Sequence, residues 1–423
     1  MEEFTLSAPL DVVLTNTTAG NKYEDYASKD HNSFLLTTPA LKWGILGTGR
    51  ICNDFTQALK HLPTASVVAC ASRNSLPNAS LFASKHNIPR SYGTYAELCN
   101  DEDVEIIYVG NVHLFRREVG EMVLNAGKHC LLEKPMALTK SDALYLSTLA
   151  TSKNLFLSEG MWTRYFPAIE HVRALISDAA IGDVTTVSSD FHFHTPDQEK
   201  YPESPLYDKK LAGGAAMYLA SYPIAASLCC FPSWPDKIVC NGVVDSATGI
   251  DTMGSISLRF PPLEGGDEAK SRDRLDNKGA GMANLHFGFL GESSEETTIV
   301  GTGGRIIIHT PAHCPTSITV ITKQPGAKRG EVEKETLTFP LPITPEDVKD
   351  SGGYYYPNSA GLAYEAAAVA RCVGGGKIET PQYTREEMVK VMEIIDEYKK
   401  QIGIQEGYEG EEEKEEGKVE VKT

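Results

Sequence analysis

Several kinds of sequence feature are missing from this chain of 423 residues. It has no dense run of Lys and Arg, and its formal net charge is −17, so nucleic acid and anionic membrane surfaces are not expected partners. It also lacks an apolar span of about 18 residues, and its N-terminus lacks the basic and apolar regions of a signal peptide, so neither membrane insertion nor secretion is expected. The nine cysteines form no C-x-x-C pair, and several lie inside apolar runs. These absences predict a cytoplasmic protein with reduced thiols and a small-molecule partner.

The chain does contain enough apolar sequence for a large core. Hydrophobic residues make up 41% of it, and its length exceeds that of one average domain, so two domains with extensions are expected. Residues 1–40 are rich in Thr, Asn, Asp and Ser without periodicity, which predicts an irregular extension. Residues 404–423 are predicted to be a disordered acidic tail, because eight Glu and only two Lys lie between Glu406 and Glu420.

The first part of the chain alternates short apolar runs with segments of helical spacing. This alternation is typical of βαβ units and a parallel sheet. An α/β domain with a Rossmann doubly wound parallel sheet is therefore predicted over residues 41–165. Its expected strands are WGIL (43–46), VVACAS (67–72), EIIYVG (105–110), HCLLE (129–133) and LFLSE (155–159).

Residues 166–403 have a different pattern. Long candidate strands follow one another without intervening helices, which predicts a C-terminal α/β domain with a large open, mainly antiparallel sheet. A polar, charged loop is expected at 264–281. The expected strands are VTTVSSDFHF (184–193), GSISLRF (254–260), NLHFGFL (284–290) and TTIVGTGGRIIIH (297–309).

Two helices are expected near the end of the chain, at 362–373 and 384–401. The second opens with Thr384 and Glu387 at the spacing of a capping box. Its apolar side chains recur at helical intervals, and this stripe is predicted to pack in the core. The stripe consists of Met388, Val391, Met392 and Ile395.

A glycine-containing motif directly follows the first predicted strand and opens a helical segment. It matches the dinucleotide fingerprint GxGxxG/A, except that Cys52 stands where the third Gly or Ala is usual. The first Gly permits a tight turn, the second lets a pyrophosphate approach the backbone, and the helix N-terminus offers free N–H groups. A dinucleotide is therefore predicted to bind to Gly47, Thr48, Gly49, Arg50 and Ile51.

The end of the second predicted strand indicates which dinucleotide is bound. An NAD site usually has Asp or Glu here, to accept hydrogen bonds from the adenosine ribose. This chain has Ser72 and Arg73 instead, so a 2′-phosphate meets a hydroxyl and a guanidinium rather than a carboxylate. NADP is therefore predicted in preference to NAD; the alternative is that Arg73 is an ordinary surface residue.

The sequence resembles the glucose-fructose oxidoreductase / inositol dehydrogenase / rhizopine catabolism family (Gfo/Idh/MocA) of NAD(P)-dependent oxidoreductases. It is most similar to the branch of dimeric dihydrodiol dehydrogenases and fungal NADP-dependent D-xylose 1-dehydrogenases. The resemblance spans residues 41 to about 403 and implies a Rossmann domain followed by an α/β domain whose open sheet makes a homodimer contact. It rests on GTGRI (47–51), YVGNVH (108–113), AGKHCLLEKPMALT (126–139), LSEGMWTRYFP (157–167), LAGGAAMYLASYP (211–223), VGTGGRIIIHTPAHCPTS (300–317) and YEAAAVARCV (364–373).

The resemblance also implies the catalytic residues. Lys134 of the EKP motif is expected beside the nicotinamide and the reacting carbon, and Tyr222 is expected to be the acid/base. A tyrosine with a pKa near 10 is a poor base at neutral pH, so a nearby ammonium group is expected to stabilise its phenolate. Spacing alone leaves open that Lys134 is a surface cation and Tyr222 a core residue. Further cofactor contacts are implied for Asn111, His113, Glu133, Trp162 and Arg164. Trp162 and Arg164 are expected at the domain junction, where a purely structural role is the alternative.

Some positions depart from the pattern of the family. Tyr218 stands where relatives usually have Asp, and Ala220 where they have Gly, so the substrate pocket and proton handling are expected to differ. If this segment is helical, Tyr218 and Tyr222 share one face. Tyr218, Tyr222 and Trp162 are the candidate substrate contacts. Pro135, after Lys134, cannot extend a strand and is expected to adopt a cis bond that aims the lysine at the cofactor.

Two histidines resemble metal ligands. His192 and His194 share a strand face with Asp190, but no further ligand has convincing spacing, so no metal site is predicted.

Two functions from different classes fit these observations. The first is an NADP-dependent dehydrogenase that acts on a sugar at aldose C1, on a cyclic diol or on another secondary alcohol, including a specialised biosynthetic substrate. The second is a catalytically silent, dinucleotide-binding regulator or scaffold of the same fold. The first is favoured because Lys134 and Tyr222 are both present.

Overall fold

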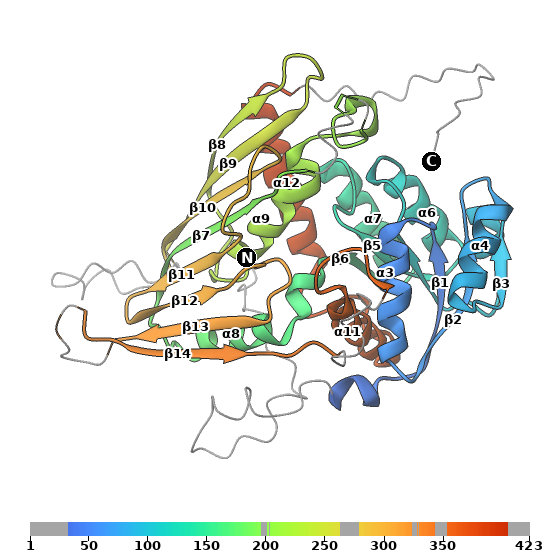
Figure 1. Cartoon of the computed structure of the whole chain (residues 1–423), viewed down its shortest axis with the longest axis horizontal. Helices are drawn as coiled ribbons and strands as arrows, with labels where there is room; N and C mark the ends of the chain where they lie inside the picture. The colour runs from blue at the N-terminus through green and yellow to red at the C-terminus, as the bar shows by residue number, and fades with distance from the viewer. Residues whose placement is uncertain are drawn as a thin grey trace.

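The structure is a computed structural model with two sheets joined by a packed junction (Figure 1). It describes residues 33–195, 201–202, 204–262, 279–323, 328, 330–342 and 353–404. Most of the predicted N-terminal extension, nearly all of the loop predicted at 264–281 and all but the first residue of the acidic tail lie outside these ranges. Within the extension, η1 (Ser33–Thr37) is a 3-10 helix, and its Leu35 is buried. The predicted irregular segment therefore includes an ordered turn that belongs to the core.

The N-terminal domain contains the predicted Rossmann sheet. Its six strands are all parallel in the order β3-β2-β1-β4-β5-β6. All four residues of β4 are buried, as expected of a strand covered by helices on both faces. The strands are β1 (Leu41–Leu46), β2 (Ala65–Ala71), β3 (Arg90–Tyr92), β4 (Ile106–Val109), β5 (His129–Glu133) and β6 (Leu157–Gly160). The helices of this domain are α3 (Arg50–Ala58), α4 (Leu76–His86), α5 (Tyr95–Cys99), α6 (Arg116–Asn125) and α7 (Lys140–Ser152).

The second sheet is open and mainly antiparallel, as predicted. Its order is β14-β13-β12-β11-β7-β10-β9-β8, and among these pairs β7 with β10 is parallel. Figure 1 shows α9 (Ser221–Leu228) and α12 (Arg385–Gln401) against one face of this sheet. The strands are β7 (Val184–His192), β8 (Lys237–Val244), β9 (Asp251–Phe260), β10 (Gly281–Gly288), β11 (Thr297–Gly301), β12 (Gly304–Ile308), β13 (Ser317–Thr322) and β14 (Glu333–Thr338).

Both predicted C-terminal helices form. Thr384 caps α12, because its hydroxyl accepts a hydrogen bond from the Glu387 N–H at 3.3 Å. The apolar stripe of this helix is fully buried, which confirms that it packs in the core. The other helix, α11 (Leu362–Gly374), contacts α3 of the Rossmann domain. The chain therefore returns to the first domain after the second sheet, so the simple division at residue 165 separates elements that pack together.

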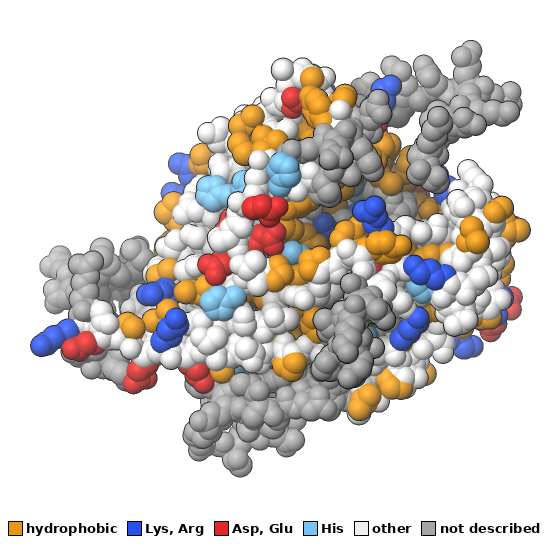
Figure 2. All heavy atoms as spheres, in the orientation of Figure 1, with side chains coloured by type: hydrophobic (Ala, Val, Ile, Leu, Met, Phe, Trp, Pro, Cys, Tyr) orange, Lys and Arg blue, Asp and Glu red, His pale blue; other side chains and the backbone are white. Residues whose placement is uncertain are grey.

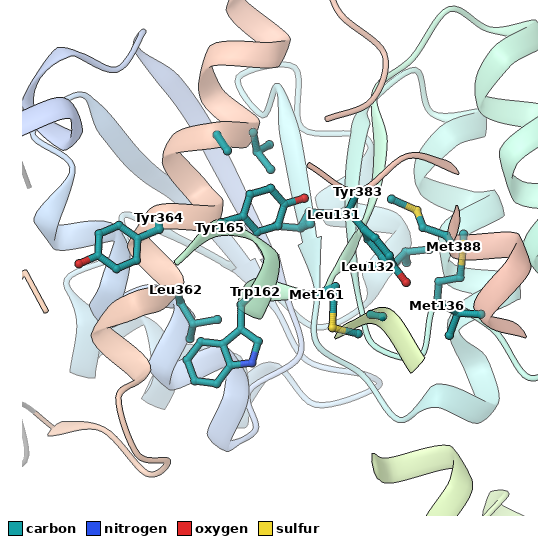
Figure 3. Packing of buried hydrophobic residues seen from close by; sticks show 14 of the residues in the cluster. Leu131, Leu132, Met136, Met161, Trp162, Tyr165, Leu362, Tyr364, Tyr383 and Met388 are labelled. Carbon is teal, nitrogen blue, oxygen red and sulfur yellow. The ribbon is translucent and has the colours of Figure 1, made fainter. Parts of the chain in front are cut away.

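The junction between the domains is built from aromatic and aliphatic side chains (Figure 3). The 3-10 helix η4 (Trp162–Tyr165) packs on α11, and Trp162 and Leu362 are both buried. On the other side of the junction, where Figure 3 labels Tyr383, its hydroxyl donates to Glu159 of β6, the strand next to β5, at 3.0 Å. Glu159 of β6 is therefore tied to a residue that lies 224 positions later in the sequence (383 against 159).

One helical stretch is more apolar than the sequence analysis expected. Lys209–Leu228 has the length and a mean hydropathy, 1.2, that are compatible with a membrane span, but 78% of its apolar window is buried inside the protein. Its last part, α9, contacts β7, β10 and α12. The core helix of a folded protein has the same composition, and these contacts account for its apolar side chains.

Candidate functional site

The nucleotide loop has the geometry that a dinucleotide requires. Gly47 has a φ of +108°, and a Cβ there would meet Cys52 Sγ at 2.9 Å. At Gly49, by contrast, a Cβ would have no atom within 4 Å, and no side chain caps the helix α3 that begins after it. The free N–H groups of this helix therefore face open space, where a pyrophosphate fits.

Cys52 performs the packing role of the usual third Gly or Ala. Its buried thiol lies 3.6 Å from the carbonyl oxygens of Leu46 and Gly110, and burial raises the pKa of the thiol to about 12. A Cβ at Gly110 would come within 2.3 Å of this sulfur. The larger residue in the fingerprint is thus accommodated by a glycine directly after the neighbouring strand β4.

Ser72 and Arg73 lie directly after β2, at the carboxyl end of the sheet. Ser72 is buried, and its N–H bonds to the carbonyl of Tyr92 at 3.3 Å. The exposed Arg73 places its guanidinium 4.5 Å from the ring centre of Phe115. The arginine is therefore partly ordered, with its charge accessible from solvent.

A segment from the far end of the chain borders the nucleotide loop. The buried carboxylate of Asp54 on α3 accepts hydrogen bonds from the N–H groups of Tyr355 and Tyr356 and from the Ser359 hydroxyl, at 2.7 to 3.0 Å. The guanidinium of Arg50 lies 5.8 Å from the centre of the exposed Tyr355 ring. The sequence analysis did not predict this contribution of residues 353–361 to the cofactor side.

Lys134 lies directly after β5, and its peptide bond with Pro135 is cis, as expected. The buried Arg116 fixes this backbone, because it donates to the Pro135 carbonyl at 2.6 Å and to the Asn111 carbonyl at 3.0 Å. One guanidinium therefore ties together the ends of the neighbouring strands β4 and β5.

The Lys134 ammonium points at the helical segment that carries the two candidate tyrosines. Its Nζ donates to the Tyr218 carbonyl at 2.8 Å and lies 4.5 Å from the centre of the Tyr222 ring. Burial lowers the pKa of Lys134 to about 8, while the Glu133 carboxylate acts in the opposite direction. The side chain is therefore mainly charged at neutral pH and loses its proton as the pH rises through about 8.

The acceptor for Lys134 results from an irregular helix. Residues Ala216–Ala220 form the π-helix η7, in which the carbonyl of residue i pairs with the N–H of residue i+5. Five residues after Tyr218 the chain has Pro223, which has no N–H. Pro223 therefore cannot donate to the Tyr218 carbonyl, which accepts a hydrogen bond from Lys134 Nζ.

Tyr222 lies in an aromatic pocket. Its hydroxyl accepts a hydrogen bond from Trp162 Nε1 at 3.2 Å, and its ring centre is 5.2 Å from Phe191 and 5.3 Å from His313. Burial and the negative charge of Glu133 raise the pKa of this phenol well above its usual value, whereas the bond from Trp162 acts to lower it. The Lys134 ammonium lies 4.5 Å from the centre of the Tyr222 ring, and Tyr222 is neutral at neutral pH in this arrangement.

Two buried carboxylates surround the lysine. Glu133 accepts a hydrogen bond from the Tyr108 hydroxyl at 2.7 Å, and Glu159 accepts from the Met136 N–H at 3.1 Å and from the Tyr383 hydroxyl at 3.0 Å. Burial raises the pKa of Glu159 to about 7. These groups place negative charge near the ammonium and hold the end of β5 in position.

The other predicted cofactor residues differ in their surroundings. Both side-chain polar atoms of Asn111 are buried without a hydrogen-bond partner among the described residues, which suits a polar ligand group. His113 Nε2 lies 2.9 Å from the Ala212 carbonyl, and its ring meets Tyr218 edge to face at 5.1 Å. Arg164 forms a buried ion pair with Glu387 and donates to the Gln382 carbonyl at 3.1 Å. These contacts of Arg164 lie in the domain junction, where its motif was expected to lie.

The structure brings together residues that the sequence analysis did not select. Asp251 accepts a hydrogen bond from the Ala216 N–H at 2.8 Å at the start of η7, and burial raises the pKa of this carboxyl to about 6. His313 and Glu295 lie on the pocket wall beside Tyr222. His313 belongs to the motif AHCPTS, but nothing in that motif indicates contact with Tyr222, which lies 91 positions earlier in the sequence. Among the described residues, no group of three or more His, Cys, Asp or Glu is arranged to hold a metal ion.

Comparisons with known proteins agree with this architecture. Residues 41–161 match the family model described as oxidoreductase family, NAD-binding Rossmann fold, and residues 169–307 match that described as GFO/IDH/MocA C-terminal domain. The chain belongs to the GFO/IDH/MocA family of oxidoreductases. Its similar curated relatives include the trans-1,2-dihydrobenzene-1,2-diol dehydrogenases of Xenopus laevis and Homo sapiens. The Xenopus laevis protein is 34% identical over 86% of this chain and 99% of its own length. The Homo sapiens protein is 32% identical over 86% of this chain and 98% of its own length.

Solved structures of the GFO/IDH/MocA family share the fold at lower identity. A 3-ketoreductase from Actinomadura kijaniata, in complex with NADP and TDP-benzene, is 19% identical with a TM-score of 0.67 over 86% of this chain and 98% of its own. A levoglucosan dehydrogenase, in complex with NADH and levoglucosan, is 15% identical with a TM-score of 0.70 over 86% and 97%. The chain is accordingly an NAD(P)-dependent dehydrogenase of the type that acts on CH–OH groups, as predicted.

Proposed function

We propose that the protein transfers a hydride between NADP and a carbon that carries a hydroxyl group, in a sugar at aldose C1 or in a cyclic diol. The observation that carries this proposal is the Lys134 ammonium, which lies between the Tyr218 carbonyl and the face of Tyr222 at the carboxyl end of β5. Ligands of open parallel sheets bind at this edge. Relatives that are about one-third identical bear the name of a diol dehydrogenase, which supports the same class of substrate.

Different residues of the chain have different roles in the proposed reaction. A bound nicotinamide supplies the hydride acceptor or donor. The uncapped start of α3 is suited to hold the pyrophosphate, and the unpaired polar atoms of Asn111 suit the nicotinamide side. Tyr222 donates its proton to a carbonyl oxygen during reduction, because its neutral form is strongly favoured. Removal of a hydroxyl proton by Tyr222 during oxidation requires added positive charge near the ring, which Lys134 contributes in part.

The cofactor preference is proposed to depend on Arg73. Replacing Arg73 by Gln should weaken NADP binding about 10- to 100-fold, the effect of losing one charge-assisted bond to a phosphate, and should leave NAD binding nearly unchanged. Titrating NADPH and NADH by fluorescence measures both affinities. Arg117→Gln is a matched control, since its guanidinium lies 4.4 Å from the Tyr145 ring centre on a helical surface. An unchanged preference for NADP in Arg73→Gln would contradict the assignment.

The second sheet is proposed to make a homodimer contact through its uncovered face. Several apolar side chains on β8 and β10 are 39% to 51% exposed, which is unusual for a sheet that faces water. Sedimentation velocity of the purified protein is expected to give the mass of a dimer, and a monomer at micromolar concentration would contradict this arrangement. The exposed residues are Val239, Val243, Val244 and Met282.

A substrate panel tests the proposed activity. Purified protein is mixed with NADP or NAD and with individual aldoses and cyclic diols, and reduced cofactor is followed by its absorbance. At least one aldose or diol should give NADPH, at a higher rate than it gives NADH. Cofactor binding without turnover across the whole panel would instead support the silent regulator or scaffold.

A further inference from the structure

His313 lies against the catalytic tyrosine in the substrate half of the site. Its ring is stacked on Phe191 at 4.5 Å with an interplanar angle of 13°, and its ring centre is 5.3 Å from Tyr222 and 6.1 Å from Trp162. Trp162 Nε1 in turn bonds to the Tyr222 hydroxyl. The imidazole therefore packs against Tyr222 and against the tryptophan that bonds to the Tyr222 hydroxyl, the group proposed to exchange a proton with the substrate.

The imidazole is held beside a carboxylate. His313 Nδ1 lies 3.4 Å from Glu295 Oε2, within ion-pair range, and both side chains are largely buried, with exposed fractions of 11% and 15%. No described residue accepts a well-directed hydrogen bond from this buried nitrogen. The other ring nitrogen, Nε2, lies 3.4 Å from the sulfur of Cys314. Neither ring nitrogen of His313 therefore forms a strong hydrogen bond with a neutral group of the described residues.

The backbone keeps Glu295 in place. Its N–H donates to Asp190 Oδ2 at 2.9 Å, and its carbonyl accepts from the Ala312 N–H at 2.9 Å. The segments that carry Glu295 and His313 are thus tied to each other and to the end of β7. The backbone hydrogen bonds therefore hold Glu295 and His313 next to each other.

A small cavity opens between this pair and Tyr222. Its polar lining includes Ser189, Asp190, Tyr222, Glu295, Thr297 and His313. The hydroxyls of Ser189 and Thr297 bond to each other at 2.7 Å, and Asp190 is engaged by the Ser294 hydroxyl and the Glu295 N–H. Glu295 and His313 are consequently the lining groups with the most hydrogen-bonding capacity left for a ligand. Figure 2 shows acidic and His side chains gathered over the middle strands of this sheet.

We propose that the Glu295–His313 pair binds a second hydroxyl group of the substrate, next to the carbon that is oxidised. The inference rests on the proposed function and adds the feature that selects polyhydroxylated substrates over simple alcohols. A neutral imidazole has one donor and one acceptor nitrogen, and the carboxylate adds acceptor oxygens, so the pair can match the donor and the acceptor of a hydroxyl ligand. A site built to bond a hydroxyl discriminates strongly against an analogue that lacks it, because its buried polar groups are then left unpaired.

The test uses substrates that differ by one hydroxyl and a variant that keeps the ring. The pairs are trans-cyclohexane-1,2-diol with cyclohexanol, and D-xylose with 2-deoxy-D-xylose. His313→Phe preserves the stacking on Phe191 and removes both nitrogens. Binding to the NADPH complex is measured by calorimetry and turnover by absorbance. We expect His313→Phe to weaken binding and raise KM at least about 10-fold for the substrate with the extra hydroxyl. Its kcat and the values for the matched analogue should stay within about threefold.

Two further variants separate the hydroxyl contact from general disturbance. His313→Gln retains a donor and an acceptor and should recover part of the lost selectivity. His309→Phe removes a similar imidazole, whose Nδ1 lies 3.3 Å from Glu296 and whose Nε2 lies 2.7 Å from the Thr319 hydroxyl, and it should leave selectivity unchanged.

The outcomes distinguish this inference from the proposed function. If His313→Phe is as selective as the wild type, the inference is overturned even if the protein is an active dehydrogenase. The inference is also overturned if no compound of the two substrate pairs binds to the wild-type protein. Selective binding by the wild type that is lost in His313→Phe, without NADPH formation, supports the inference and contradicts the proposed function.

Discussion

Replacing Lys134 by Met is expected to reduce kcat/KM about 1000-fold, within the range that a positioned acid–base or charge-stabilising group contributes. Methionine has similar length but neither charge nor donor. It therefore removes the bond to the Tyr218 carbonyl and the positive charge 4.5 Å from the Tyr222 ring. NADPH affinity should change only a few-fold, because the pyrophosphate is expected to bind at the start of α3. Steady-state kinetics and an NADPH titration measure the two effects separately.

The control for this variant is Lys140→Met. Lys140 begins the next helix, is about half exposed, and forms an ion pair with Glu393 at 2.9 Å. An exposed pair of this kind contributes little to stability, so both activity and melting temperature should stay close to wild type. Turnover by Lys134→Met at the wild-type rate would remove the basis of the catalytic assignment.

Tyr222→Phe is the second substitution with a large expected effect. It deletes the proton donor of the proposed reaction, so kcat should fall about 100- to 1000-fold while KM changes less. The stability cost should be only about 1 kcal/mol, since one hydrogen bond from Trp162 is lost and the ring and its aromatic neighbours remain. Steady-state kinetics and thermal unfolding provide the two readouts.

Tyr364→Phe provides the matched control for Tyr222→Phe. Tyr364 is equally a buried tyrosine, and its hydroxyl donates to the Pro340 carbonyl at 3.2 Å in the core. It should lose comparable stability and keep full kcat. Equal loss of kcat in both variants would show that the effect of Tyr222→Phe comes from disturbed packing and not from a missing proton donor.

The sequence predicted those parts of the fold that depend on local patterns. The parallel strands near 43–46, 105–110 and 129–133 formed because continuous apolar runs require burial on both faces. The short strand β3 was missed, because its three residues, Arg90–Tyr92, have no apolar pattern. The stretch 297–309 was predicted as one strand, but Gly301–Gly304 turn it into the hairpin β11–β12. Strands β8, β13 and β14 were not among the strands given by residue range; β8 and β14 form the two edges of their sheet.

The candidate site was predictable to a lesser extent. Motif resemblance selected Lys134 and Tyr222, which the structure brings together. The π-helix that contains Tyr218 packs on α12 and β10, and residue spacing indicated only an ordinary helix. The position of His313 next to Tyr222 likewise arises from the pairing of distant strands. The motif of Arg164 indicated the domain junction, but not its ion-pair partner Glu387, which lies more than 200 positions later in the sequence.

The most direct test of the central claim is the transfer of deuterium from substrate to cofactor. The protein is incubated with NADP and either D-xylose deuterated at C1 or trans-cyclohexane-1,2-diol deuterated at its carbinol carbons, and the NADPH formed is analysed by mass spectrometry. We predict that wild-type protein yields NADPH carrying one deuterium with at least one of these substrates, and that Lys134→Met yields almost none. NADPH without deuterium, or equal transfer by wild type and Lys134→Met, would contradict the account.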